Sequence, residues 1–163
     1  MAIVRGAILR SMTFAVLLTL GMVGCWMRRQ DVRGHDCSEL AKRYFRESRQ
    51  HTMAEFGDYD VETQYAILIC GIQYVHPPML EWGELFAREG ENVVHFLKTR
   101  LFEADDAPTI RDIVYVFTEM KRQETYDVAG DGELMRIMED KADRISDPDW
   151  RQLVEQDMNE IRR

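Results

Sequence analysis

The most distinctive chemistry in this 163-residue chain belongs to its three cysteines, Cys25, Cys37 and Cys70. A cysteine can carry an acyl group, close a disulfide, ligate a metal or act as a nucleophile. The four histidines do not extend any cysteine into a metal site, because they are scattered and no HExxH or CxxC pattern is present. We therefore expect no metal ligands, and the other three roles remain to be assigned.

Residue patterns that carry catalysis or bind cofactors are missing from the sequence. It has no glycine-rich phosphate loop and no nucleophile elbow around its few serines. The acidic stretch around Ala129 has no oxygen-bearing side chain at that position, where a calcium loop needs one. We expect no catalytic residue, no cofactor and no enzymatic activity. The alternative is a ligand-binding or enzymatic pocket between helices, near Cys70, His76 and His95.

Cys25 follows a segment with the parts of an export signal. Residues 1–24 contain Arg5 and Arg10, no acidic residue, an apolar run and a small residue, Gly24, at the end. The uncharged run from residue 11 to residue 27 has 17 residues, whereas a spanning helix needs about 20. We expect residues 1–24 to be a signal peptide cleaved after Gly24. The alternative is an uncleaved signal anchor in the inner membrane.

The four residues Met22-Val23-Gly24-Cys25 resemble a bacterial lipoprotein box, although Met22 stands where leucine is usual. This resemblance implies cleavage at Gly24 and lipidation of Cys25 with palmitate-type acyl chains. It also implies attachment to a membrane of the cell envelope. By the same resemblance, Trp26 in place of aspartate directly after the cysteine implies the outer membrane, if the source is Gram-negative. Several acyl chains would anchor the chain stably.

Residues 25–36 then serve as the lipidated cysteine and a linker, and residues 37–163 as the folded domain. At about 3.5 Å per residue the linker reaches roughly 40 Å at most, which keeps the domain close to its membrane. Without residues 1–24 the chain has 19 Lys and Arg against 29 Asp and Glu. An acidic domain repels phosphate backbones, so we expect no nucleic-acid partner.

The domain has helical periodicity in nearly every segment. Residues 65–74 are apolar nearly all round, which predicts the most buried helix, and His76-Pro77-Pro78 ends it. The acidic pairs near Pro108 and Pro148 predict turns and helix starts. The remaining expected helices cover residues 37–56, 79–88, 91–104 and 109–122, and residues 132–163 carry two further helical stripes separated by a turn at Asp147-Pro148.

Two of the expected helical hairpins repeat the same pattern. Pro108 and Pro148 are 40 residues apart, and each follows an acidic turn and precedes an apolar residue and an arginine. A two-helix unit of this length resembles HEAT repeats. We therefore predict an all-α fold, a short HEAT-like α-solenoid of helical hairpins, with an irregular helical bundle as the alternative. The resemblance implies a protein-binding or scaffolding module with a protein partner.

Cys37 and Cys70 can pair in an oxidising envelope. One continuous helix over residues 37–56, paired with the next helix, would offset the two cysteines by about 13 Å along the axis. A disulfide therefore needs an interrupted first helix, and the alternative is a core Cys70 with an exposed Cys37. Trp82 and Trp150 are the candidate partner-binding residues if they lie on the surface, and core packing is the alternative for both.

Overall fold

The computed structural model describes residues 37–46 and 49–163, and these residues are predominantly helical, with no strand among them. Residues Cys37–Arg163 form one compact unit. The predicted signal peptide, Gly24, Cys25 and the linker lie outside the described residues. The longer helices are α4 (Val61–Gln73), α6 (Glu91–Glu103), α7 (Ala107–Arg122), α8 (Gly132–Arg144) and α9 (Pro148–Ile161), and the short α5 (Glu81–Ala87) joins α4 to α6.

Aspartates start these helices at the places where the sequence predicts turns. The side chain of Asp106 accepts a hydrogen bond from the backbone N–H of Thr109 at the start of α7. Asp147 does the same for the N–H groups of Asp149 and Trp150 at the start of α9. An acceptor at this position satisfies N–H groups that have no partner inside the helix. The predicted roles of the two acidic turns are confirmed.

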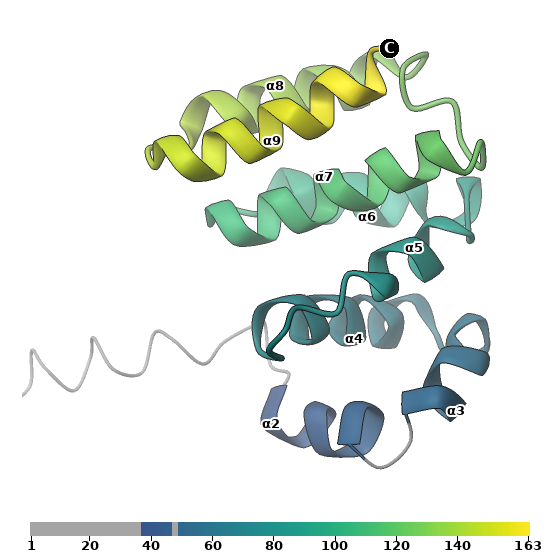
Figure 1. Ribbon diagram of the computed structural model, residues 1–163. Coiled ribbons are helices and arrows are strands. Elements are labelled where there is room, and N and C mark those ends of the chain that lie inside the picture. The colour runs from purple at the N-terminus through teal and green to yellow at the C-terminus, as the bar shows by residue number, and fades with distance from the viewer. Residues whose placement is uncertain (1–36, 47–48) are drawn as a thin grey trace, which may run out of the picture. The chain divides into compact units, whose positions relative to one another are not determined.

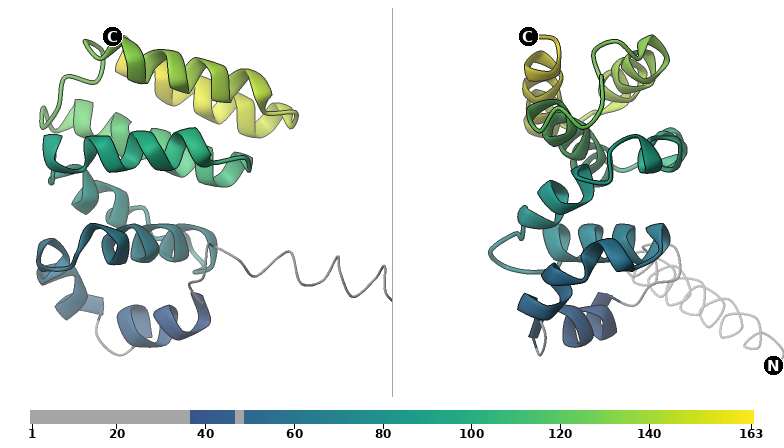
Figure 2. Two further views of the ribbon diagram at one scale, coloured as in Figure 1. Left: turned by 180° about the vertical axis from the view of Figure 1, so that it is seen from behind. Right: turned by 90° about the vertical axis from the view of Figure 1, so that its right-hand side faces the viewer.

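The helices of the unit stack in successive pairs (Figure 1). Helices α8 and α9 lie side by side, and α6 and α7 form the next pair below them in that view. Helix α7 packs most extensively against α9 and then against α5, and α6 packs against α8. The views from behind and from the side show the same order of layers (Figure 2). The all-α prediction is confirmed.

Helix α7 lies in the middle of this stack. Every residue from Asp112 to Met120 is buried, because α4, α5, α6, α8 and α9 all contact the helix. The sequence predicts α4 as the most buried helix, and residues 66–72 of α4 are indeed buried. Polar residues interrupt the apolar run of α7, so the length of its apolar run does not predict its central position. They include Asp112 and Glu119, which are buried among hydrogen-bonding and charged partners.

The first predicted helix, residues 37–56, is not continuous. It divides into α2 (Cys37–Leu40), the π-helix η2 (Ala41–Arg46), α3 (Arg49–Ala54) and a short 3-10 turn, η3 (Phe56–Asp58). The apolar stripe of this segment fades after Phe45, so no single face holds one long helix against the core. The structure thus has the interrupted first helix that a disulfide between Cys37 and Cys70 requires, and the axial offset of a continuous helix does not apply.

Candidate functional site

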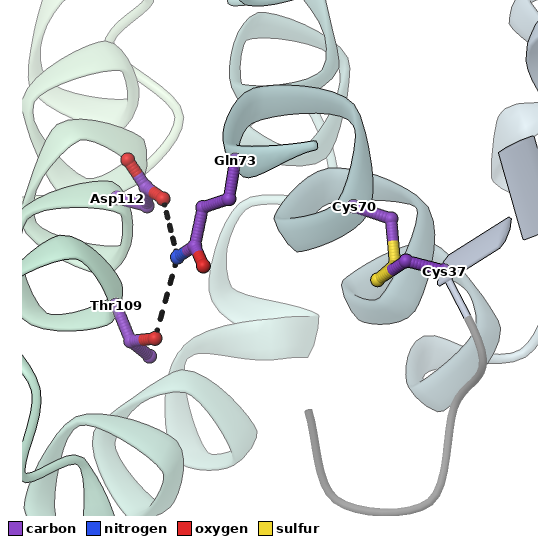
Figure 3. The surroundings of a disulfide bond; sticks show 5 residues. All are labelled: Cys37, Cys70, Gln73, Thr109 and Asp112. Atoms are coloured by element: carbon purple, nitrogen blue, oxygen red, sulfur yellow. Dashed lines mark hydrogen bonds between the residues drawn. A yellow bond between two sulfur atoms is a disulfide. The ribbon is translucent and has the colours of Figure 1, made fainter. Parts of the chain in front are cut away.

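Cys37 and Cys70 form a disulfide in the structure (Figure 3). Their sulfur atoms are 2.04 Å apart and their Cα atoms 5.4 Å apart. Cys37 is the first residue of α2, and Cys70 lies in the last part of α4. The side chain of Cys70 is fully buried, and Cys37 is nearly so. The bond fixes the start of the folded unit to a core helix, and bonded sulfurs offer no thiolate for catalysis or metal binding.

A buried polar junction lies one turn beyond the disulfide on α4. The side-chain amide of Gln73 donates a hydrogen bond to Oδ2 of Asp112, at 2.9 Å, and to Oγ1 of Thr109, at 3.3 Å (Figure 3). On the other side of the Asp112 carboxylate, Nη1 of Arg111 donates to Oδ1 at 3.4 Å. This junction joins α4 to α7, and it uses both oxygens of a carboxylate that is 2% exposed.

Burial raises the pKa of Asp112 to about 6, although the hydrogen bond from Gln73 and the charge of Arg111 favour the ionised form. Burial also raises the pKa of Asp157 on α9, despite the nearby guanidinium of Arg111. The Nε atom of Arg111 lies 3.9 Å from Oδ2 of Asp157, too far for a hydrogen bond. Neither atom has a hydrogen-bond partner within the described part of the chain. These groups form a helix junction that favours a proton on Asp112 at mildly acidic pH.

We expect the variant Asp112→Asn to lose a pH dependence of stability that the wild type has. Because the folded pKa of Asp112 lies above the unfolded value of 3.8, the folded protein binds more protons between roughly pH 4 and pH 6. The contribution of Asp112 to stability therefore falls as the pH rises through this window. A rise of about two pKa units corresponds to a difference on the order of 3 kcal/mol.

Urea unfolding of both proteins at pH 4.5 and pH 7.5 checks this expectation. Asparagine has no charge at either pH, so the variant should gain stability relative to the wild type on going from the lower to the higher pH. Contributions from other carboxyl groups cancel in the comparison. If the two proteins differed in free energy of unfolding by the same amount at pH 4.5 and at pH 7.5, the raised pKa of Asp112 would be contradicted.

Trp82 lies in the core and not on the surface, which corrects its candidate role in partner binding. Its side chain is fully buried in α5. The rings of Phe45 and Phe56 pack against it, with centroids 5.7 Å and 5.6 Å away. A large aromatic side chain gains most by removing its whole surface from water. Core packing, the alternative for this residue, describes the structure.

Trp150 lies near the start of α9 and is half-buried, packed against the core. The largest exposed apolar side chains of the described residues are others, namely Tyr74, Leu80, Phe102 and Leu153. The sequence analysis missed them because each has an apolar residue type that ordinarily belongs to a core. For Tyr74 and Leu80 a signal existed, since they flank the two prolines that end α4.

Tyr74 lines a groove of about 520 Å³. Phe45 and Met79 also line it, together with Pro77 and Pro78. We call residues 74–80 the proline loop. His76 also lines this groove, whereas Cys70 is fully buried in the disulfide and His95 is exposed on α6. The predicted alternative of a pocket formed jointly by Cys70, His76 and His95 is therefore wrong.

Within the part of the chain that the structure describes, no three His, Cys, Asp or Glu side chains gather to hold a metal ion. No helix in the same part is both long and apolar enough to cross a bilayer. No protein-family model, curated protein or solved structure matches the chain. The site must therefore be interpreted from its own residues.

Proposed function

We propose that this chain is a lipoprotein of the cell envelope, anchored through acyl chains on Cys25. We further propose that its helical domain is a short HEAT-like solenoid that binds or scaffolds a protein partner near the membrane, without catalysis. The observation that carries the proposal is the disulfide between Cys37 and Cys70. Disulfides persist in oxidising compartments and are rare in the reducing cytosol. A disulfide at this position supports an exported domain.

The disulfide also bears on the role of Cys25. Because Cys37 and Cys70 are bonded to each other, neither of them is available as a disulfide partner for Cys25. It directly follows Gly24 and the export-type segment. An exported cysteine in this position, behind a lipoprotein-like box, is best explained as the site of lipidation. If the source is Gram-negative, Trp26 favours the outer membrane, and an inner-membrane signal anchor is the alternative.

Three features support a HEAT-like arrangement. The hairpins α6–α7 and α8–α9 each turn through an aspartate cap and a proline, at Pro108 and Pro148. Equivalent helices of the two hairpins pack on each other, α7 on α9 and α6 on α8. Lys141 of α8 donates a 2.6 Å hydrogen bond to the carbonyl oxygen of Ala104, which directly follows α6. Stacked helical pairs offer an extended surface for protein binding, and this inference rests on fold analogy.

The variant Cys25→Ser tests the anchoring. In cells fed radiolabelled palmitate, we expect the wild-type protein to carry the label and Cys25→Ser to carry none, because serine offers no thiol for acylation. The variant should also keep its first 24 residues and migrate as the longer precursor. Cys37→Ser is the control, and it should keep the label. Wild-type protein that carries no label and is not shortened would support the signal anchor instead.

A further inference from the structure

We propose that the proline loop, residues 74–80, lies against the bilayer surface and seats the acidic domain on its membrane. This inference rests on the lipid anchor proposed above. Its basis is the juxtaposition of an exposed apolar loop with the point at which the anchored segment enters the folded unit. The loop and its groove then contact the lipids of the membrane, at the boundary between the headgroups and the acyl chains.

The disulfide determines which end of the domain is tethered. Twelve peptide units join Cys25 to Cys37, which gives a reach of roughly 40 Å at most. Cys37 is bonded to Cys70, and the backbone N–H of Tyr74 donates a 3.1 Å hydrogen bond to the carbonyl oxygen of Cys70. Tyr74 is therefore one helical turn from the tether point. Of the large exposed apolar residues in the described part of the chain, it is the one that the covalent structure holds closest to the anchor.

The composition of the loop suits a lipid surface. No Asp, Glu, Lys or Arg occurs between Thr63 and Leu80, although charged residues make up 31% of the chain. Tyr74 is 47% exposed and Leu80 is 37% exposed, and His76, Pro77 and Pro78 between them are exposed as well. Tyrosine is enriched where membranes meet water, because its ring enters the apolar layer while its hydroxyl stays hydrated.

Charge at the edge of the loop does not oppose this contact. The nearest carboxylate in sequence, Glu81, forms an ion pair with Arg49, which is itself half exposed. The strong negative charge of the domain comes from other segments. Anionic lipid headgroups would repel those segments. The proline loop is thus a surface that approaches an anionic bilayer without placing an unpaired carboxylate on it. Because the bilayer repels the acidic rest of the domain, contact through the proline loop is favoured.

Tryptophan reporters in the full, acylated chain test the proposal. Leu80→Trp places a reporter in the loop, and Leu153→Trp is the matched control, because Leu153 on α9 is 41% exposed. Tyr74→Trp is a second reporter in case Leu80→Trp perturbs the start of α5. Each protein is reconstituted into vesicles of phosphatidylethanolamine and phosphatidylglycerol, with and without acyl chains brominated near the glycerol end. The emission of the wild type, with its 3 tryptophans, is subtracted.

We expect brominated lipid to quench the added emission at positions 74 and 80 by at least half and to leave that at position 153 almost unchanged. Equal quenching at all three positions, or none at positions 74 and 80, would overturn the inference. The mass of the same sample records acylation. An acylated protein without loop quenching defeats this inference alone, whereas an unacylated protein defeats the proposed anchor and the inference with it.

Discussion

A protein in which alanine replaces both Cys37 and Cys70 should unfold with a free energy about 4 kcal/mol lower than that of the wild type, by the chain-entropy model of disulfides. The two cysteines are 33 residues apart in sequence. Their bond removes the entropy that an open loop of this length has in the unfolded state. Urea unfolding of the full chain in detergent measures the loss of stability.

Reduction provides the matched control. Wild-type protein treated with a thiol reductant should lose stability to the level of the double alanine variant, and the variant itself should not respond to the reductant. Cys25 has no part in the bond, so Cys25→Ser should unfold like the oxidised wild type. An unfolding midpoint of the wild type that reduction leaves unchanged would contradict the disulfide.

The second large effect concerns the core. Trp82→Ala should lower the free energy of unfolding by about 3–5 kcal/mol, the range for a buried large aromatic residue replaced by alanine. Trp82 fills the space between Phe45, Phe56 and α4, and its indole ring occupies the place where a side chain on Gly71 of α4 would begin. A cavity of this size cannot collapse without moving α4. Thermal or urea unfolding measures the change.

Two comparison variants sharpen this expectation. Trp150→Ala should have less than half the effect, because Trp150 is half-buried. Trp82→Phe should have only a small effect, because the Nε1 atom of Trp82 has no hydrogen-bond partner among the described residues. Phenylalanine removes this unsatisfied donor and keeps most of the packing. If Trp82→Ala and Trp150→Ala were equally stable, the assignment of Trp82 to the core would be wrong.

The second half of the fold could be predicted closely from sequence. Helices α6 and α7 begin and end within two residues of the expected bounds, and α8 and α9 lie on either side of the expected turn at Asp147-Pro148. The reason is local, since Asp106 and Asp147 cap helices and Pro108 and Pro148 are tolerated only in a first turn. Such signals act over three or four residues and depend little on the surrounding structure.

The first part of the unit could not be predicted in the same way. Residues 37–56 contain no proline or glycine, and the apolar stripe that fades after Phe45 is only a weak local sign of the division into α2, η2 and α3. The division follows from tertiary contacts, among them the packing of α2 against α4 and the disulfide. The junction of Gln73 with Asp112 was missed for the same reason, because it joins residues 39 positions apart. Only a folded chain brings such groups together.

The candidate sites also differ in whether a local sequence feature or tertiary packing determines them. Residue type alone could not place Trp82 and Trp150 in the core or on the surface, because burial depends on which helix face meets the core. The exposed pair Tyr74 and Leu80 follows from a local feature, the two prolines between them, which keep this stretch out of any helix. A scan for apolar residues that flank helix-ending prolines would have found the proline loop.

The mass of the mature N-terminal peptide, isolated from the native membrane, tests the central proposal most directly. The proposal expects a peptide that begins at Cys25 and is heavier than its sequence by a thioether-linked diacylglyceryl group. An additional acyl chain on the new amino group would agree with it. A peptide that begins at Met1, or an unmodified thiol at Cys25, would contradict the lipid anchor.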